Sequence, residues 1–430
     1  MKPKAVKQIL SSVIRDVAAD RSFLVRPDSD YTRSRKLSLL QMLRLILSMG
    51  GSTINREMVD FFHATPRVAS SSAFVQRRAK ISHTAFEAIF HRFTAKTDTK
   101  CLYRGYRLLA ADGSGVHFPT DPSDSDSFFP GANGQKPYNL IHLNALYDLL
   151  THTYRDVVLQ KGSGSEKDAV IEMLQRSHDR NVLLIADRGY ESYNLMAYCQ
   201  EKGWRFLIRV KDHAVKGIVT RLPLPDADSF DVPITVCLTN MASKAAKQIP
   251  HYKFLPSTAP FDFFPRDAPI SYYELRFRVV RFQIAEDAYE TVITNLPEKL
   301  FPMEEVEKLY AMRWGIETSF RDLKHTVGLL RFHSKKAESI MQEIFAALTM
   351  YNFAQVITQF AVLEQGKRKY SYQVNFAQAV HLCRQFFRDN AVSPPALEAL
   401  LARYVTPIRP NRHAPRSPGV KPVVSFQYRG

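Results

Sequence analysis

Short apolar runs alternate with helical segments between residues 106 and 211, and this alternation leaves few folds open to the chain. The expected order is three strands, a helix, a strand, a helix and a final strand. These elements are predicted at residues 107–111, 139–149, 153–160, 165–177, 182–186, 190–202 and 205–210. Such an order predicts an α/β sandwich built on a mixed sheet.

The N-terminal segment, residues 1–100, has a different character. Leucine and isoleucine recur at helical spacing between Leu37 and Leu47, so this segment is predicted to be helical. Further helices are expected at residues 72–81 and 84–93. An N-terminal helical region should therefore precede the α/β unit.

The residue pattern changes twice in the segments that follow the α/β unit. Residues 212–300 are rich in proline, and a hairpin near residue 286 is expected from apolar alternation, so this segment is predicted to be a β-rich insertion. Residues 301–360 return to helical patterns. Residues 361–430 are predicted to form a C-terminal helical region followed by an extended, proline-rich basic tail.

The distribution of charge points to a polyanionic partner. The chain has 59 Lys and Arg residues against 42 Asp and Glu, a formal net charge of +17. Residues 1–100 carry 18 basic and 8 acidic side chains, and residues 399–430 carry six basic and no acidic ones. Nucleic acid is the first candidate partner, and an anionic membrane surface is the weaker alternative. Arg77, Arg78 and Lys80 are expected to contact DNA, unless they form the solvated face of an ordinary helical domain.

Several classes of protein are excluded by composition. The four cysteines are far apart and form no CxxC pair, so neither a disulfide scaffold nor a structural zinc site is expected. No apolar run approaches the roughly 20 residues that span a bilayer, and the basic N-terminus lacks the pattern of a secretory signal. We therefore expect no membrane partner and a cytoplasmic protein.

Two aspartates, Asp112 and Asp187, directly follow apolar runs that are predicted to be strands. Carboxylates at the ends of strands lie at the edge of a sheet where ligands bind. Taken singly, Asp112 could equally form an Asp-Gly turn, and Asp187 could cap the following helix. Arg188, next to Asp187, could reach a phosphate or form a structural ion pair.

A helix predicted from residue 303 to beyond residue 324 adds a third carboxylate. Tyr310, Arg313, Glu317 and Lys324 fall within about 60° of one another at helical geometry, on one polar face. Three carboxylates can hold two Mg²⁺ or Mn²⁺ ions for phosphoryl transfer, and oxygen ligands favour these ions over Zn²⁺. The alternative is a surface helix with an ion pair between Arg313 and Glu317.

The spacing of these four residues resembles the signature of the IS4-type family of DDE transposases. Asp112 within LLAADGSGV and Asp187 within LIADRGY resemble the first and second catalytic aspartates of that family. The segment TVITNL, residues 291–296, and the β-rich insertion before it are also similar to the family. The resemblance extends from about Leu37 to the C-terminus.

The resemblance implies an RNase H-like catalytic core, formed by residues 101–211 and 301–360 and interrupted by the insertion. It implies metal-dependent cleavage of double-stranded DNA at the terminal inverted repeats of a transposon, then strand transfer into target DNA by a homodimer on the bacterial nucleoid. The implied ligands of two Mg²⁺ ions, for which Mn²⁺ can substitute, are Asp112, Asp187 and Glu317. The implied contacts to DNA near the scissile phosphate are Tyr310, Arg313 and Lys324.

Two alternatives stay open on the sequence. The chain could be a catalytically silent DNA-binding protein derived from a transposase, or a nuclease with the same RNase H-like core. A requirement for two specific DNA ends would separate a transposase from such a nuclease.

Overall fold

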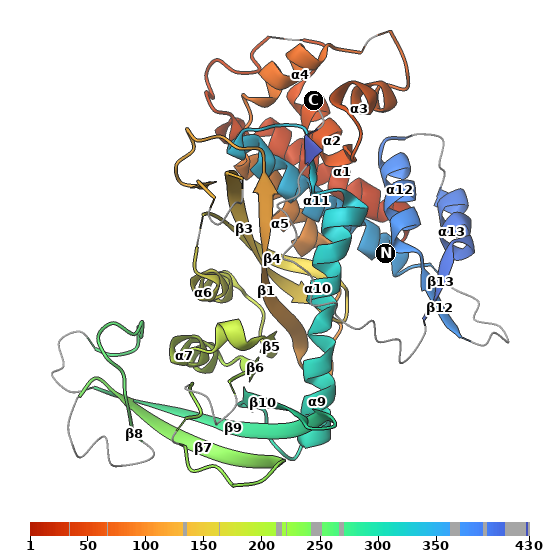
Figure 1. Ribbon diagram of the computed structural model, residues 1–430. Coiled ribbons are helices and arrows are strands. Elements are labelled where there is room, and N and C mark those ends of the chain that lie inside the picture. Colours follow the sequence, from red (N-terminus) through yellow and green to blue (C-terminus); the bar gives the residue numbers. More distant parts are fainter. Residues whose placement is uncertain are drawn as a thin grey trace.

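The computed structural model describes most of the chain, and its centre is a large mixed sheet with helices on both sides (Figure 1). The described residues are 1–33, 35–66, 68–131, 136–162, 164–211, 217–220, 222–241, 252–265, 271–361, 370–389, 394–408 and 427–428. The predicted basic tail lies almost wholly outside these residues.

The sheet contains ten strands within the described residues, in the order β2-β3-β1-β5-β6-β10-β9-β7-β8, with β4 paired to β3. Pairing is parallel between β1 and β5 and between β5 and β6, and antiparallel between β1 and β3. The strands are β1 (Arg107–Phe118), β2 (Phe128–Phe129), β3 (Tyr138–Asp148), β4 (Thr153–Lys161), β5 (Val182–Ala186), β6 (Arg205–Arg209), β7 (Phe230–Thr239), β8 (Tyr252–Phe254), β9 (Tyr272–Ala285) and β10 (Ala288–Thr294). The predicted mixed sheet is thus confirmed.

Strand β1 is buried on both faces, which explains its apolar start. Leu108 and Ala110 belong to one hydrophobic core, whereas Leu109 and Ala111 belong to a second. The second core is closed by α6 (Glu166–Arg176) and α7 (Tyr193–Lys202). Because side chains alternate along a strand, the sheet separates two helical layers.

The N-terminal helices belong to the first core and therefore pack directly on the α/β unit. They are α1 (Pro3–Ala19), the 3-10 turn η1 (Arg21–Phe23), α2 (Leu39–Ser48), α3 (Ile54–Phe61), α4 (Ser71–Arg78) and α5 (Thr84–Lys96). Ser38 begins α2 with a capping box, in which its hydroxyl accepts from the Gln41 amide and the Gln41 side chain accepts from the Ser38 amide. The helices predicted at residues 72–81 and 84–93 are confirmed with small shifts at their ends.

The β-rich segment extends the central sheet instead of forming a separate layer. Strand β10 pairs antiparallel with β6, and β9 then joins β10 to β7. The predicted hairpin is present, and Asp287 in its turn has a positive φ of 56°. Figure 1 shows these strands at the far end of the molecule from the N-terminal helices.

The helix predicted from residue 303 is built from three consecutive pieces that follow one line in Figure 1. They are α9 (Met303–Met312), α10 (Trp314–Arg321) and the π-helical turn η3 (Asp322–Val327). The long helix α11 (Ala337–Thr358) then packs on α5 and α2. The remaining elements are η2 (Arg188–Tyr190), β11 (Arg331–Phe332), β12 (Ser371–Val374), α12 (Phe376–Phe387), α13 (Pro394–Arg403), β13 (Val405–Ile408) and β14 (Gln427–Tyr428).

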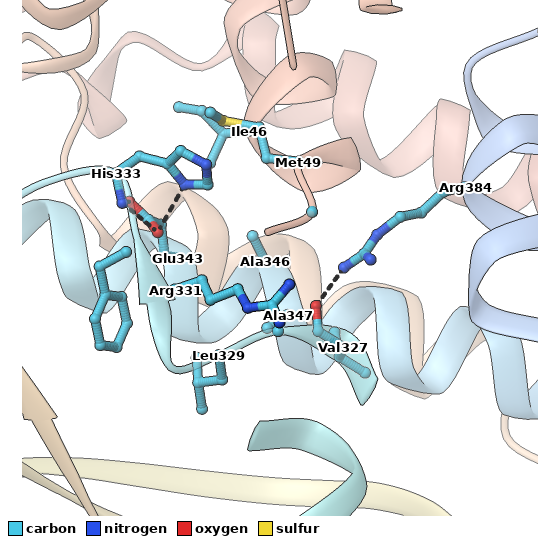
Figure 2. Close-up of a pocket in the computed structure, with 13 residues that line it drawn as sticks. Ile46, Met49, Val327, Leu329, Arg331, His333, Glu343, Ala346, Ala347 and Arg384 are labelled. Atoms are coloured by element: carbon cyan, nitrogen blue, oxygen red, sulfur yellow. Dashed lines mark hydrogen bonds and ion pairs between the residues drawn. The ribbon is translucent and has the colours of Figure 1, made fainter. Parts of the chain in front are cut away.

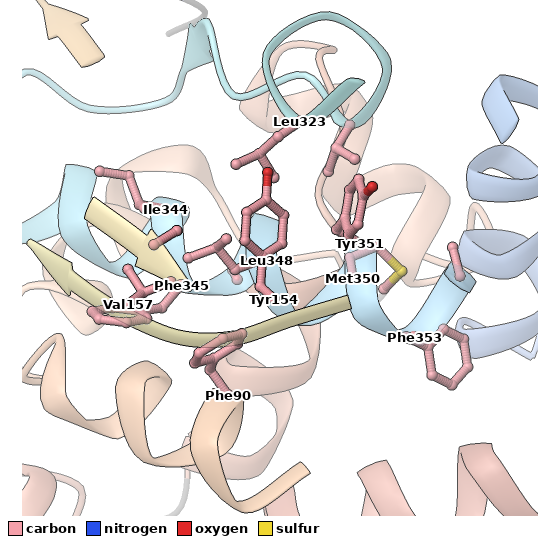
Figure 3. Close-up of a cluster of buried hydrophobic side chains, with 14 of the residues drawn as sticks. Phe90, Tyr154, Val157, Leu323, Ile344, Phe345, Leu348, Met350, Tyr351 and Phe353 are labelled. Carbon is pink, nitrogen blue, oxygen red and sulfur yellow. The ribbon is translucent and has the colours of Figure 1, made fainter. Parts of the chain in front are cut away.

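A cluster of buried aromatic and aliphatic side chains holds η3 against α11 and β4 (Figure 3). Leu323 on η3 is fully buried beside Tyr154 and Tyr351. The Ser319 hydroxyl donates to the Tyr154 hydroxyl at 2.9 Å, which ties α10 to β4. The position of the residue that follows Leu323 is therefore fixed by core packing. None of the helices in the described part of the chain is long and apolar enough to cross a bilayer.

Candidate active site

Asp112 and Asp187 each follow the last parallel pair of β1 and β5, which is Ala111 with Ala186. Asp112 continues β1, whereas Asp187 is the first residue after β5 and precedes η2. Asp112 was predicted to end its strand, and this is wrong: β1 continues to Phe118 because β3 pairs with it well beyond the end of β5.

Local hydrogen bonds orient both carboxylates. The Asp112 Oδ1 atom accepts from the Gly113 amide at 2.9 Å, within an extended strand and not a turn. The Asp187 Oδ1 atom accepts from the Gly189 amide at 2.7 Å, so Asp187 does cap the short 3-10 turn η2. In both aspartates, this hydrogen bond involves only the Oδ1 atom of the carboxylate.

Arg313 and Glu317 form the ion pair that the helical spacing allows. The Arg313 Nη2 atom lies 2.7 Å from Glu317 Oε1, and the Arg313 side chain is almost fully buried. The guanidinium also lies 5.8 Å from the centre of the Tyr310 ring and 5.1 Å from that of Trp314. Tyr310 is buried, whereas Trp314 is half exposed. Arg313 thereby links Tyr310 to Glu317.

Lys324 connects the π-helical turn to β1. Its Nζ atom donates to the Ser114 hydroxyl at 2.7 Å and to the Gly115 carbonyl at 3.0 Å. Burial lowers the pKa of the Lys324 ammonium, and the charge of Asp112 opposes this effect. Because Leu323 is anchored in the core, Lys324 is held two to three residues from Asp112 along β1. A π-turn inside a helix is frequent at functional sites.

The groups around Asp112 shift its pKa in opposite directions. Burial is the largest cause that raises the pKa of the Asp112 carboxyl, the Gly113 amide and Arg313 lower it, and the charges of Asp187 and Glu317 raise it, so that the net pKa is about 7. A buried carboxyl surrounded by other carboxylates is stabilised in its ionised form by a nearby cation. The site therefore combines a shared negative charge with a flanking cation.

The donor set fits a hard divalent cation that keeps part of its water shell. The side chains that meet here supply carboxylate oxygens, which suit Mg²⁺ and Mn²⁺. Within the described ranges, no three His, Cys, Asp or Glu side chains converge closely enough to bind an ion directly. Two carboxylates with several retained waters are an ordinary arrangement for Mg²⁺.

The predicted DNA contacts on α4 are placed differently from the expectation. Arg78 is buried, and its guanidinium donates to Gln342, to the Ser339 carbonyl and to Glu343. Its donors are directed into the protein, and this argues against the predicted DNA contact. Lys80 is partly exposed and forms an ion pair with Asp30 at 2.8 Å.

Arg77 and Arg188 lie at two polar pockets on different parts of the surface. Arg77 donates to the Leu37 carbonyl and lies over the Tyr31 ring, 3.7 Å from its centre. Arg188 is exposed beside Asp187 and lines a polar cavity of about 280 Å³ together with Arg209 and Lys211, among other residues. Arg188 is next to Asp187 in sequence, but the lining of this cavity includes none of the predicted metal ligands.

Another pocket, shown in Figure 2, has a different character. Arg384 Nη2 donates to the Val327 carbonyl at 2.6 Å, and His333 Nδ1 lies 3.2 Å from Glu343 Oε2. The lining includes none of the predicted metal ligands. The contacts join the end of η3 to α12 and α11, so this pocket is a structural junction.

One carboxylate near the site was missed by the sequence reasoning. Glu166, the first residue of α6, lies against Gly113 and near Gly189. The two glycines that follow Asp112 and Asp187 were the available signal, because a residue without a side chain leaves room for a neighbouring group.

Known transposases are similar to this chain. The Transposase DDE domain family matches residues 103–353, a range that contains Asp112, Asp187, Glu317 and Lys324. The transposase InsG of insertion sequence element IS4 from Escherichia coli (strain K12) is 22% identical over 370 residues, covering 81% of this chain and 75% of that protein. The transposase of insertion sequence element IS1151 from Clostridium perfringens is 19% identical over 252 residues, 53% of each chain.

A solved structure is also similar over most of the chain. The cryo-EM structure of the piggyBac transposase synaptic complex with hairpin DNA covers 98% of this chain and 87% of its own, with a TM-score of 0.45 and 12% identity. The family match alone covers more than half of the chain and defines a DDE transposase, a nucleic-acid-cleaving enzyme. Within that class, the chain belongs to the IS4 family of insertion-sequence transposases.

Proposed function

We propose that this transposase cuts DNA at the terminal inverted repeats of its element and joins the ends to target DNA, in cut-and-paste transposition on an RNase H-like core. The observation that carries the proposal is that Asp112 and Asp187 directly follow the last parallel pair of β1 and β5, and that Lys324 contacts β1 two residues after Asp112. Arg313 pairs with Glu317 in the helical segment that also carries Lys324. The residues lie in or next to β1, β5, α10 and η3, and Asp112 and Lys324 are 212 residues apart in sequence. Protein groups that must act on one phosphate have to converge in this way.

Asp112, Asp187 and Glu317 would hold two Mg²⁺ ions, for which Mn²⁺ can substitute. When bound, such ions activate water or a 3′-hydroxyl and stabilise the leaving oxygen. Arg313 supports this role because it fixes the Glu317 carboxylate at 2.7 Å. In a DNA complex, Arg313 and Tyr310 would border the scissile phosphate from the α9–α10 side.

Lys324 has the position of a direct phosphate contact. Its ammonium is partly buried and donates to Ser114 and Gly115, on the same strand as Asp112. A cation in a site of low dielectric stabilises developing negative charge more strongly than one in water. Arg188, exposed beside Asp187, would contact an adjoining phosphate of the same DNA.

The DNA-binding surface of the N-terminal region would centre on the loop before α2. Arg33 and Arg35 are exposed and line a pocket of about 180 Å³ with Arg21 and Arg77. The hydrogen bonds of Arg21 and Arg77 go to backbone carbonyls, which leaves their charge without a carboxylate partner in those contacts. A cluster of guanidinium groups of this kind binds the phosphates of double-stranded DNA. The synaptic complex would contain two copies of the chain, working on the bacterial nucleoid.

An end-cleavage assay tests this proposal. The protein is incubated with Mg²⁺ and a DNA that carries the two element ends, with Glu317→Ala as the test variant and Glu307→Ala as the matched control. Glu307 is exposed on α9 and lies ten residues before Glu317. We expect Glu317→Ala to abolish cleavage and Glu307→Ala to retain it. Cleavage by both variants would refute the active-site assignment, and cleavage of DNA without the ends would indicate a nuclease.

A further inference from the structure

Glu166 lies between the two strands that carry the catalytic aspartates. A Cβ atom at Gly113 would be 2.5 Å from Glu166 Oε1. A Cβ atom at Gly189 would be 3.0 Å from Asp187 Oδ1 and 3.6 Å from Glu166 Oε2. The Glu166 and Asp187 carboxylates therefore border the same small space, and the glycines after both aspartates leave room for Glu166.

A chain of polar side chains lies behind the Glu166 carboxylate. His142 Nε2 lies 3.4 Å from Glu166 Oε1, and His142 Nδ1 lies 3.1 Å from Asn144 Oδ1. Asn144 in turn donates to Gln160 Oε1 at 3.0 Å. His142 and Asn144 are on β3, directly opposite Gly115 and Gly113 of β1. Such second-layer contacts are typical of groups whose orientation affects a bound ion.

A buried phenol lies three residues after Asp187. Tyr190 is fully buried, and its hydroxyl has no hydrogen-bond partner among the side and main chains that the structure describes. Burial raises the pKa of Tyr190, and the charges of Glu166, Asp112 and Asp187 raise it further, so the hydroxyl remains a donor. A buried hydroxyl without a partner is costly unless a ligand or water satisfies it. The Tyr190 hydroxyl is thus a donor close in sequence to Asp187 whose partner is not among the described protein groups.

We propose that Glu166 is a positioning residue of the active site, which accepts a hydrogen bond from a water molecule on a divalent ion held by Asp112 and Asp187. The proposal rests on the metal-dependent function proposed above. Glu166 would act through water and would leave the direct coordination of the ion to the aspartates. Mg²⁺ and Mn²⁺ sites retain waters, and outer carboxylates orient them.

The experiment measures Mn²⁺ binding to the full chain without DNA, by electron paramagnetic resonance of free Mn²⁺. Glu166→Gln keeps the size of the side chain and removes its charge. Gly113→Ala displaces the Glu166 carboxylate, since the new methyl group would overlap it. Glu172→Gln is the matched control, because Glu172 lies on the same helix, α6, with an exposed side chain that pairs with Arg176. We expect about tenfold weaker Mn²⁺ binding in the first two variants and unchanged binding in the control.

Asp112→Asn completes the design and separates the two proposals. If Asp112→Asn loses Mn²⁺ binding but Glu166→Gln and Gly113→Ala bind like the wild type, the role of Glu166 is refuted and the metal site stands. If Asp112→Asn also binds Mn²⁺ normally, both proposals fail. A Glu166→Gln variant that is less stable to heat, yet binds Mn²⁺ with wild-type affinity, would assign Glu166 to the structure of α6 alone.

Discussion

Without metal, the negative charge of Asp112 should lower the free energy of unfolding, and replacing Asp112 by a neutral residue should remove this effect. Burial first, and then the charges of Asp187 and Glu317, raise the pKa of Asp112 from 3.8 to about 7. A carboxyl whose pKa is raised by folding favours the folded state below pH 3.8, and this contribution is lost as the pH rises towards about 7. Asn has the same shape and no charge, so Asp112→Asn should escape the loss.

The size of the effect follows from the shift of the pKa. Each pKa unit corresponds to about 1.4 kcal/mol, so ionising Asp112 costs the folded state about 2 kcal/mol at pH 5 and about 4 kcal/mol at pH 8. The stability of Asp112→Asn relative to the wild type should therefore increase by about 2–3 kcal/mol between these pH values. The contributions of other titrating groups largely cancel in this difference, because the variant and the wild type both contain them.

Urea unfolding in EDTA, followed by the fluorescence of the buried Trp204, provides the assay. Asp28→Asn, at an exposed position, is the control and should change stability by less than about 0.5 kcal/mol at either pH. Adding Mg²⁺ at pH 8 should stabilise the wild type much more than Asp112→Asn, since the ion offsets the repulsion. A difference between Asp112→Asn and the wild type that stays constant from pH 5 to pH 8 would contradict the reasoning.

Three further predictions concern other contacts of the structure. Lys324→Ala should reduce end cleavage at least tenfold while gel-shift affinity for the ends stays unchanged; equal losses in both would make Lys324 a simple binding residue. Arg78→Ala should lower the free energy of unfolding by about 3–5 kcal/mol, because Glu343 would be left buried without this cation. Arg33→Ala should instead leave the free energy of unfolding unchanged and reduce the slope of log affinity for DNA against log salt concentration by about 1. Burial lowers the pKa of His333 but Glu343 raises it more, so the net pKa of His333 is raised. Protonated His333 therefore stabilises the folded protein fully below pH 6.5, and this contribution is lost as the pH rises. In urea unfolding, His333→Gln should not show that loss of stability.

The strands of the core could be predicted because each is a short apolar run between polar turns. Their extent could not, as β1 shows: after Ala111 it enters the polar stretch DGSGV, which has no strand pattern of its own. Pairing with β3 keeps that stretch extended as far as Phe118. The same limit applies to the β-rich segment, since only the pairing of β10 with β6 reveals that it continues the central sheet.

The helix that carries Glu317 could be predicted because the pattern that defines it lies within one short segment of the sequence. The spacing from Tyr310 to Lys324 sets a single face, and the ion pair between Arg313 and Glu317 follows from a separation of four residues. Glu166 could not be found in this way, because its position depends on how α6 packs against β1 and β3. A carboxylate near the start of a helix is common, and only the contact with Gly113 distinguishes this one.

The net charge of +17 overstates the positive charge that DNA can meet, and the structure explains why. Arg78 is buried in an ion pair with Glu343, which is 265 residues away, and Arg107 is buried against Asp98 and Asp148. These cations hold distant parts of the chain together and cannot also contact phosphates. The basic residues that can bind DNA are therefore those with exposed side chains or with backbone partners only, as around Arg33. The number of charged residues in the sequence indicates the sign of the partner's charge, whereas the contacts in the structure decide which side chains can reach that partner.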